Sequence, residues 1–527
     1  MSEAGSVDRC AGRDPWRGAS RPLRAALAVC LVGALAACAG PGVPAEDPAL
    51  PAPLDDPWFS AGRAEARAVA ATRDTGPRAR NVILFVGDGM GISTITAARI
   101  LEGQRQGRPG EGSALSFEAL PEVALVRTYN TNQQVPDSAG TMTAMMSGVK
   151  TKAGILGLSD GALPGDHTTA AHSRVPTLLE RAEVRGLATG VVSTARITHA
   201  TPAACYAHSP LRNWEDDTRL SAAARADGFV DLARQLVEFE YGDGLEVALG
   251  GGRRHFLPAE TPDPEYPRRR GARGDGLDLM QAWRDARPGS EAVWNAEQLA
   301  AVDEQSVQHL LGLFEPSHMQ WEADRARDAA GEPSLSAMTV TALDVLSRNP
   351  RGFFLMVEAG RIDHAHHAGN AYRALDDTIE LSNAVRAALD RVDLEETLVV
   401  VTADHSHVFT VTGYPTRGND ILGLVRPNGA DGRPTGSPAR DARGRPYTTL
   451  GYANGPGFAS SQLDLSEVDT ADHDFRQPAT LPLRSETHGG EDVAVYAGGA
   501  GSRYFAGVRE QSYVYHAIEA ALGWSPR

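Results

Sequence analysis

The sequence predicts an α/β fold in which a large, mostly parallel sheet lies between two layers of helices. Three observations carry this prediction. Apolar runs of strand length recur along the chain, glycine or aspartate bounds them, and amphipathic helical stretches separate them. Because strands that are buried on both faces are continuously apolar, and parallel strands need crossover helices, this pattern is typical of a three-layer α/β/α sandwich.

Six runs have the character of buried strands, at 81–88, 186–194, 245–250, 352–360, 397–405 and 492–499. Helical periodicity is clearest at 371–391 and 513–522. The segment from about 413 to 483 is rich in glycine, proline, asparagine and aspartate and has little periodicity, so it is predicted to be an insertion. With 527 residues, the chain is long enough for one large domain with insertions or for two to three smaller ones.

The N-terminus has the features of a targeting segment. Several arginines precede the apolar run 25–37, which is too short to span a bilayer but fits the hydrophobic part of a signal peptide. The run ends at "LAAC", which resembles a bacterial lipobox and predicts cleavage before Cys38 with a lipid on its thiol. Ordinary cleavage that leaves Cys38 unmodified is the alternative. The expected divisions of this exported, periplasmic or cell-surface protein are a signal peptide at 1–37, a flexible tether at 38–79 and a folded domain at 80–527.

Charge and cysteine content exclude two possibilities. The formal net charge of -16 argues against a nucleic-acid partner, because such binders need a basic surface that displaces counterions. Once the signal peptide is removed and Cys38 is modified, Cys205 is the one cysteine left, so no internal disulfide is expected. Cys205 is predicted to be a small buried residue.

Carboxylates and imidazoles follow the ends of the predicted strands. They form four clusters far apart in sequence: Asp88; Glu358 with Asp363 and His367; Asp404 with His405; and His488. Ligands collect at the carboxyl ends of parallel strands, so the clusters are expected to meet on one edge of the sheet. Asp363 and His367 are four residues apart, a spacing that suits zinc. Each cluster alone is explained more simply by a turn aspartate or a surface histidine, but the four together favour a metal site.

Ser138 is the candidate nucleophile. It is predicted to stand at the start of a helix, where backbone N–H groups and the positive helix end favour a phosphate group. A helix-capping role for Asp137 or Ser138 is the simpler alternative. A seryl hydroxyl must be activated by a base or a cation, and no histidine lies nearby in sequence. Coordination to zinc is therefore the expected means of activation.

Longer stretches of the chain carry a resemblance to a known family. The segments "FVGDGMG", "PDSAGT", "THATPAACYAH" followed by "RNW", "RNPRGFFLMVEAGRIDHAHH", "TADHSHVF" and "ETHGGEDVAVYA" resemble the successive motifs of the alkaline phosphatases, and are closer to the animal-type branch. The resemblance covers nearly all of residues 80–525. It implies an alkaline-phosphatase-like fold with a crown-like insertion, and a metal-dependent phosphomonoesterase that acts through a phosphoserine. It also implies two zinc ions, one magnesium ion and a homodimer.

The same resemblance implies individual roles. Ser138 matches the nucleophile, and Arg212 matches a guanidinium that holds two phosphate oxygens. The implied metal ligands are Asp363, His367 and His488 for one zinc, Asp88, Asp404 and His405 for the other, and Asp88, Thr201 and Glu358 for magnesium. His199 matches a histidine that lies behind the ligands, and His364 matches a water-mediated phosphate contact.

Charge counting favours phosphate monoesters as substrates. Three divalent ions that face four carboxylates and a serine alkoxide leave about one positive charge, and Arg212 raises the sum to about two. A monoester dianion neutralises this charge, whereas a diester does not, and the guanidinium fork fits a terminal phosphoryl group. Because histidine ligands must be neutral and zinc-bound water must ionise, activity is expected to rise with pH into the alkaline range.

A second ion is implied by three further segments. Residues 261–267, 312–316 and 332–335 resemble the calcium-binding segments of animal-type members. The implied ligands are Glu265, the Phe314 carbonyl, Glu315 and Glu332, whose hard oxygens suit calcium. The family usually has aspartate where Glu332 stands. Three solvated acidic turns are the alternative explanation.

Two other functions compete with this one. Phosphodiesterases of the same superfamily often use threonine as nucleophile and lack the arginine and magnesium arrangement, so Ser138, Arg212 and the Thr201–Glu358 pair argue against them. An anchored lipoprotein that binds phosphate or metal without turnover is the second alternative. The chain has a matching residue at every position where the family has its nucleophile, metal ligands and arginine, and this argues against a protein without turnover.

Overall fold

The computed structural model describes residues 50, 52–53 and 55–524. The predicted signal peptide and Cys38 lie outside the described residues. Within the described part of the chain, no helix combines the length and the apolar character that a membrane crossing requires.

A ten-stranded sheet forms the centre of the molecule, with the strand order β15-β2-β14-β8-β1-β7-β3-β4-β6-β5. The strands are β1 (Asn81–Gly87), β2 (Glu122–Arg127), β3 (Ala188–Arg196), β4 (Val247–Gly251), β5 (Ser290–Val293), β6 (His309–Leu313), β7 (Phe353–Ala359), β8 (Thr397–Ala403), β14 (Val493–Gly499) and β15 (Gly507–Glu510). Strand β14 runs antiparallel to both of its neighbours, and the other neighbouring pairs are parallel. The prediction of a large, mostly parallel sheet is confirmed.

The middle of the sheet explains why the predicted strands are so apolar. Every residue of β1, β7 and β8 is buried. In the register, Phe85 pairs with Val357 on one side and with Val401 on the other. Because helices cover both faces, side chains of both orientations must be apolar, and the alternation of a half-exposed strand is absent. Each of the six predicted runs overlaps a strand of this sheet.

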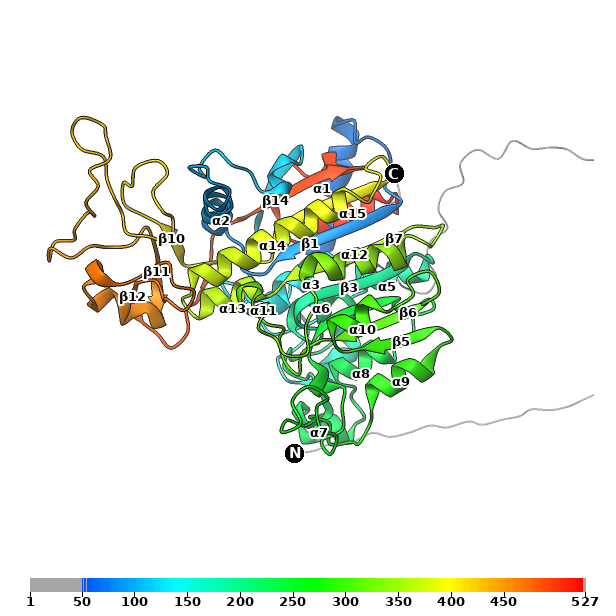
Figure 1. Cartoon of the computed structure of the whole chain (residues 1–527). Helices are drawn as coiled ribbons and strands as arrows, with labels where there is room; N and C mark the ends of the chain where they lie inside the picture. Colours follow the sequence, from blue (N-terminus) through cyan, green and yellow to red (C-terminus); the bar gives the residue numbers. More distant parts are fainter. Residues whose placement is uncertain (1–49, 51, 54, 525–527) are drawn as a thin grey trace, which may run out of the picture. The chain divides into compact units, whose positions relative to one another are not determined.

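Helices form one layer on each face of the sheet (Figure 1). One layer holds α2 (Ile92–Arg105), α12 (Leu335–Leu346) and α14 (Ala371–Leu389), which contact one another through α14. The other holds α3 (Ser138–Ser147), α5 (Leu178–Val184), α6 (Ala200–Tyr206) and α15 (Tyr513–Ala521). The arrangement is the predicted three-layer sandwich.

Helix α1 (Pro57–Thr72) overturns part of one prediction, because a flexible tether was expected up to residue 79. The Asp56 carboxylate caps the helix by accepting hydrogen bonds from the N–H groups of Trp58 and Phe59, and Pro57 occupies the first helical position. Phe59, Gly62, Ala66 and Val69 recur every three or four residues and are buried. Phe59 lies with its ring centre 5.7 Å from that of Tyr515 on α15. The folded region therefore begins well before residue 80.

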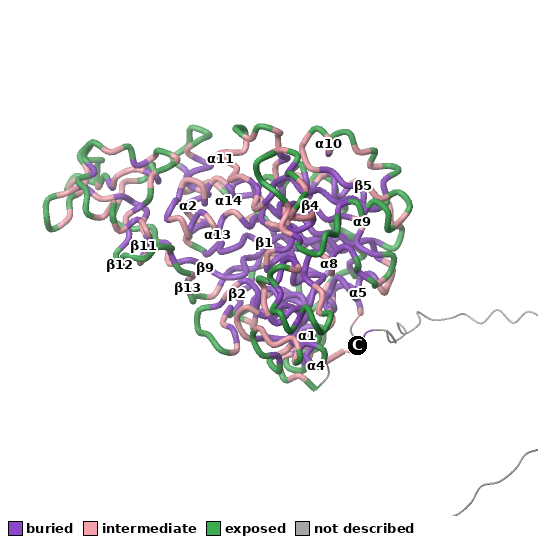
Figure 2. Tube along the Cα trace, turned by 90° about the horizontal axis from the view of Figure 1, so that it is seen from below, coloured by how far each residue is buried: buried purple, intermediate pink, exposed green. Residues whose placement is uncertain are grey.

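The predicted insertion leaves the sheet after β8 and returns before β14. It contributes β11 (Leu450–Gly455) and β12 (Ala479–Pro482), which form a small sheet with β10 (Phe409–Val411). Two-residue strands β9 (Ser406–His407) and β13 (His488–Gly489) pair at its base. Figures 1 and 2 show this segment reaching away from the large sheet, with few buried residues. Its base borders the carboxyl end of β8.

Candidate active site

The predicted clusters of carboxylates and imidazoles meet at one edge of the sheet, which we call the site edge. Asp88, Glu358 and Asp404 stand at the carboxyl ends of β1, β7 and β8, and all three are fully buried. The short helix α13 (Arg361–His367) follows β7 and carries Asp363 and His367. His488 arrives on β13. The parallel order of β8, β1 and β7 is what brings such distant residues together.

The first group consists of Asp363, His367 and His488. His367 Nδ1 lies 2.6 Å from the Glu486 carbonyl, and His488 Nδ1 lies 2.8 Å from the Pro136 carbonyl, so each of these nitrogens carries the ring proton. The two Nε2 lone pairs therefore face each other across 3.1 Å. Asp363 Oδ1 is 3.3 Å from each of them. Such a set of unprotonated donor atoms suits a bound cation.

His407 supports this group, and the sequence prediction did not include it among the site residues. Its Nε2 is 2.8 Å from Asp363 Oδ1 and its Nδ1 is 2.5 Å from Glu486 Oε2. Burial works against protonation, but Glu486 and Asp363 raise the pKa of His407 to about 10. His407 is therefore an imidazolium that donates to two carboxylates and holds Asp363 in place. Burial opposes ionisation of Asp363, but the neighbouring rings of His367, His407 and His488 hold the pKa of this carboxyl well below its usual value.

The second group lies beside Ser138. His405 Nε2 is 3.4 Å from Asp88 Oδ1, 3.3 Å from Asp404 Oδ2 and 3.2 Å from Ser138 Oγ. His405 Nδ1 faces the Ser406 carbonyl at 3.2 Å, which leaves the lone pair on Nε2. Burial holds the pKa of His405 well below its usual value, so the ring is neutral. Asp88, Asp404 and Ser138 thus converge on the unprotonated Nε2 of His405, and burial raises the pKa of both carboxyls. A cation bound among these atoms would offset that cost, so the group suits a second cation site.

The third group is made of oxygen atoms. Both carboxylate oxygens of Asp88, Glu358 Oε1 and Thr201 Oγ1 are buried and have no hydrogen-bond partner. Burial, helped by Asp404, raises the pKa of Asp88 well above its usual value and that of Glu358 to about 7. A nitrogen of His199 lies within 4.8 Å of the ligand atoms of Asp88 and Glu358. Buried oxygens without partners are costly, and a divalent cation would compensate for them.

Helix α3 presents the candidate nucleophile. Asp137 is the N-cap residue and accepts a hydrogen bond of 3.1 Å from the Gly140 N–H, whereas Ser138 is the first helical residue. Gly140 lies so close to Asn130 that an added Cβ would come within 2.4 Å of its Oδ1. Asp137 therefore caps the helix, and this leaves the hydroxyl of Ser138, the candidate nucleophile, free to face His405 at the positive end of the helix.

Arg212 lies next to this helix start. Its Nη1 donates to Asp137 Oδ2 at 3.0 Å, and its Nη2 is 3.1 Å from His199 Nε2. Burial opposes ionisation of Asp137, but Arg212 and the Gly140 N–H lower the pKa of this carboxyl. Asp137 thus both caps α3 and orients the guanidinium. This second role depends on a tertiary contact across 75 residues, so the sequence prediction missed it.

Three histidines form the remaining wall. The rings of His364 and His318 are centred 4.0 Å apart, and that of His199 lies 5.4 Å and 5.3 Å from them. Burial lowers the pKa of each of them well below its usual value, so the wall is neutral. His318 was not predicted, because it stands alone in the sequence. A backbone N–H and the guanidinium of Arg196 contact its ring.

Away from the site edge, glutamates and an aspartate form a second concentration of charge, the acidic cluster: Glu265, Glu315, Asp328 and Glu332. Carboxylate oxygens of the first three lie within 4.8 Å of one another. Burial, followed by Glu315, raises the pKa of Glu332 to about 9, and burial raises that of Glu265 to about 7. Buried oxygens of Glu265, Asp328 and Glu332 have no hydrogen-bond partner. The prediction for this cluster lacked Asp328 and included the carbonyl of Phe314, which directly precedes Glu315.

The alkaline phosphatase family model matches residues 79–524. The tissue-nonspecific alkaline phosphatase of Gallus gallus is 48% identical over 457 residues, which are 85% of this chain and 85% of the relative. The alkaline phosphatase of Thermus thermophilus has a similar structure, with a TM-score of 0.62 and 26% identity, over 87% of this chain and 94% of that one. A variant of the alkaline phosphatase from the Antarctic bacterium TAB5, with magnesium in its M3 site, has a TM-score of 0.57 and 22% identity over 85% and 99% of the two chains.

The match to the family model extends from just before β1 to the end of the described residues, and so includes the whole sheet. The chain belongs to the alkaline phosphatase family.

Proposed function

We propose that this alkaline phosphatase hydrolyses phosphate monoesters by passing the phosphoryl group first to Ser138 and then to water. The observation that carries the proposal is the position of Ser138 Oγ, 3.2 Å from His405 Nε2, beside the buried oxygens of Asp88, Glu358 and Thr201 that have no hydrogen-bond partner. The positive end of α3 and the guanidinium of Arg212 lie beside it. A dianionic phosphoryl group matches this charge distribution.

Metal ions complete the site in this proposal. The two groups with histidine nitrogens would hold zinc, through Asp363, His367 and His488, and through Asp88, Asp404 and His405. The oxygen-only group of Asp88, Thr201 and Glu358 would hold magnesium, which prefers such ligands. The magnesium in the M3 site of the TAB5 enzyme supports a third ion in this fold. When bound, these ions supply Lewis acidity, which lowers the pKa of hydroxyl groups and water and neutralises developing charge.

The residues of the chain then have distinct tasks. Arg212 binds two non-bridging oxygens and aligns the phosphorus with Ser138, while Asp137 fixes the guanidinium. Ser138 Oγ bonds to phosphorus as the bond to the alcohol oxygen breaks, and the alcohol gains one proton for the proton that the serine loses. Water then bonds to the phosphorus of the phosphoserine, the Ser138 Oγ–P bond breaks, and the serine regains a proton as phosphate leaves.

Two chromogenic substrates test this proposal. Purified protein is expected to hydrolyse p-nitrophenyl phosphate far faster than bis-(p-nitrophenyl) phosphate, with a rate that rises into the alkaline range. EDTA is expected to abolish the activity, and added zinc and magnesium are expected to restore it. Preference for the diester, or full activity after complete removal of metal, would contradict the proposal.

We also propose that the acidic cluster binds one calcium ion. Its support is a set of hard oxygens on three loops, several of them buried and unpaired. Arg253 donates to Glu265 at 3.0 Å and offsets part of the charge. The single positive charge of Arg253 does not balance the four carboxylates of the acidic cluster, and a bound calcium ion would offset the remaining charge. Calcium titration followed by calorimetry tests for the site.

A homodimer is the proposed assembly. Large apolar side chains are exposed on the insertion and the small sheet beside it, with exposed fractions of 89% for Tyr414 and 58% for Leu481. The resemblance to the family implies this assembly, and a partner that covers these side chains would remove their apolar surface from water. Light scattering is expected to give twice the chain mass, and Tyr414→Asp with Leu481→Asp is expected to give monomers.

Export and anchoring through a lipid on Cys38 complete the proposal, and they rest on the sequence pattern of residues 1–38. Mass spectrometry of the N-terminal peptide from membranes is expected to show a diacylated Cys38. An unmodified Cys38, or an N-terminus elsewhere, would contradict the anchor without affecting the catalytic proposal.

A further inference from the structure

The cleft between α1 and the C-terminal end of α15 holds an unbalanced set of positive charges. The cleft has a volume of about 550 Å³, and Arg63, Arg67 and Arg78 line it together with small residues such as Ala70 and Ala520. We call it the arginine cleft. Arg78 lies three residues before β1, whereas Asp88 directly follows that strand. The cleft and the site edge are therefore separated by the length of β1, about 20 Å.

The three arginines have no partner among the described residues, and this distinguishes them from their neighbours. Arg73 pairs with Glu122, and Arg80 pairs with Glu396 at 3.1 Å. Arg503 and Arg509 likewise pair with Asp74 and Glu65. No hydrogen bond or ion pair joins the side chain of Arg63, Arg67 or Arg78 to another described residue, although the chain has 67 acidic residues against 51 basic ones. An external anion is the natural partner for these guanidinium groups.

Local geometry adds to the imbalance. Arg63 and Arg67 are four residues apart on α1, where like charges repel each other. The Nε atom of Arg63 is buried without a hydrogen-bond acceptor. The nearby ring of His516 is buried and uncharged, so it does not offset the charge of Arg63. Burial, together with Arg63, lowers its pKa to about 3.

Small residues keep the cleft open beside the charges. Ala66, Ala70, Ala520 and Ala521 leave room that larger side chains would fill. Gly523 has a φ of +72°, and a Cβ there would lie 2.8 Å from Arg78 Cδ and Nε. Glycine at 523, which adopts this φ without strain, leaves room for the Arg78 side chain beside the chain that follows α15.

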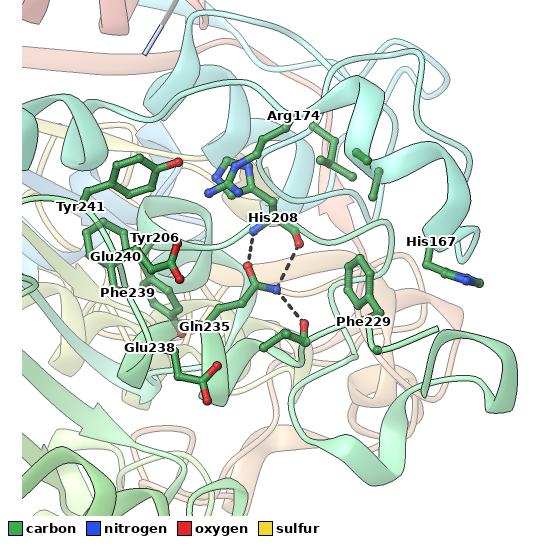
Figure 3. Close-up of a pocket in the computed structure, with 15 residues that line it drawn as sticks. His167, Arg174, Tyr206, His208, Phe229, Gln235, Glu238, Phe239, Glu240 and Tyr241 are labelled. Carbon is green, nitrogen blue, oxygen red and sulfur yellow. Dashed lines mark hydrogen bonds between the residues drawn. The ribbon is translucent and has the colours of Figure 1, made fainter. Parts of the chain in front are cut away.

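A second cavity, shown in Figure 3, differs in this respect. It has a volume of about 410 Å³, and the basic side chains at its centre are matched within the protein. His208 lies 2.7 Å from Glu180 and 2.6 Å from the Gly157 carbonyl, Arg174 pairs with Glu180 at 2.9 Å, and Gln235 bonds to backbone groups. Since Arg174 and His208 already have Glu180 as a partner, this cavity gives no comparable indication of an anionic ligand.

We infer that the arginine cleft is a second anion site, separate from the site edge, which binds a phosphoryl group. Guanidinium forks match phosphoryl oxygens in pairs, and three of them can surround one such group. The group is either free inorganic phosphate or the head group of an anionic phospholipid. The second source fits the position of the cleft on α1, which follows the segment that would carry the lipid anchor.

Calorimetric titration with inorganic phosphate tests the site in the metal-loaded protein. Wild-type protein is expected to bind phosphate at two sites, one of them at the site edge. Arg63→Gln/Arg67→Gln/Arg78→Gln is expected to weaken the second site at least about tenfold and to leave kcat unchanged. Arg67→Gln/Arg78→Gln, which alters exposed residues only, guards against a folding defect. The control Arg73→Gln/Arg80→Gln removes the same charge from paired arginines and is expected to keep both sites.

Sedimentation with vesicles distinguishes the two sources. Protein made with Cys38→Ser, so that no lipid is attached, is mixed with phosphatidylcholine vesicles with or without phosphatidylglycerol. Binding that requires phosphatidylglycerol and is lost in the triple variant assigns the cleft to lipid head groups, and a second free-phosphate site without vesicle binding assigns it to phosphate. Equal phosphate binding and equal sedimentation of wild type and triple variant would overturn the inference.

Discussion

The site edge and the acidic cluster both gather buried carboxylates, but their surroundings differ. At the site edge, carboxylates lie beside histidine rings, as in His367 and His488. The Nδ1–H groups of these rings point to backbone carbonyls, so their Nε2 atoms face the carboxylates. In the acidic cluster, Glu315 and Asp328 have a tyrosine hydroxyl and other carboxylates as neighbours. Strand ends hold the first set, whereas loops hold most of the second. Mixed nitrogen and oxygen ligands with a nucleophile beside them suit catalysis, while hard oxygens alone suit a stabilising ion.

The largest expected effect follows from removing the nucleophile at the site edge. Ser138→Ala is expected to lower kcat for p-nitrophenyl phosphate at least about a thousandfold and to abolish the phosphoenzyme, because no other hydroxyl faces His405 in the described residues. Bound metal is expected to stay near the wild-type amount. Ser147→Ala, at the other end of α3, is the matched control and should keep its activity. A phosphoenzyme in Ser138→Ala would contradict the assignment.

The second largest effect is expected from removing the guanidinium of Arg212. Arg212→Ala is expected to lower kcat/KM about a hundredfold, since two charge-assisted hydrogen bonds to the phosphoryl group are lost. Arg212→Lys keeps the charge but not the fork, and its activity is expected to fall between the two. Steady-state kinetics measures both. Arg174→Lys, which alters the guanidinium paired with Glu180 in the other cavity, should be neutral. Wild-type kinetics in Arg212→Ala would remove this residue from the site.

A smaller effect separates the two roles of Asp137. Asn is a good helix cap, but its amide N–H₂ would face the two donors to Asp137 Oδ2, Arg212 and the Gly154 N–H, so Asp137→Asn is expected to lower the melting temperature by a few degrees. It removes the charge that holds Arg212, and KM is expected to rise with an overall loss of about tenfold in kcat/KM. Asp56→Asn alters the cap of α1, far from the site, and serves as the control. An unchanged KM would mean that Arg212 needs no support from Asp137.

The acidic cluster is expected to affect stability rather than turnover, and the effect depends on pH. The pKa values of Glu265 and Glu332, about 7 and about 9, lie above the ordinary value of 4.5. Their protonated forms therefore favour folding at low pH, and this contribution is lost as the pH rises through those values. Calcium is expected to raise the melting temperature by a few degrees at about pH 9 and by less at about pH 6.

Glu332→Gln sharpens this prediction. The variant removes one member of the repelling set, so its calcium-free form is expected to melt higher than the wild type at alkaline pH and to gain less from calcium. Differential scanning calorimetry with and without calcium gives both quantities. A calcium effect that is equal in variant and wild type, or that is independent of pH, would contradict binding in the acidic cluster.

The sequence predicted the middle of the fold better than its margins. Strands β1, β7 and β8 are buried on both faces, so their apolar runs are unmistakable. The runs of β2 and β15 contain exposed residues such as Val123 and Val508, and were not recognised as strands. Helix α1 was not predicted because the segment 39–80 as a whole is rich in alanine, proline, aspartate and arginine and shows no clear periodicity. Its buried positions become evident only against the surface of α15.

The candidate site shows the same division. Asp88, Asp404 and His405 lie at ends of strands that the sequence reveals, so their meeting was predictable. The supporting roles of Asp137, His407, Glu486 and His318 depend on side-chain contacts between distant segments, for which a single sequence gives little signal. The sequence prediction of the acidic cluster missed Asp328 for the same reason. It included Glu332 because the segment 332–335 resembles a calcium-binding segment of the family.

Elemental analysis of the purified protein, made in parallel with the p-nitrophenyl phosphate assay, tests the central claim most directly. The account predicts two zinc ions and one magnesium ion per active chain, and activity that disappears when EDTA removes them and returns when both metals are restored. Full turnover by protein that holds no divalent metal would contradict it.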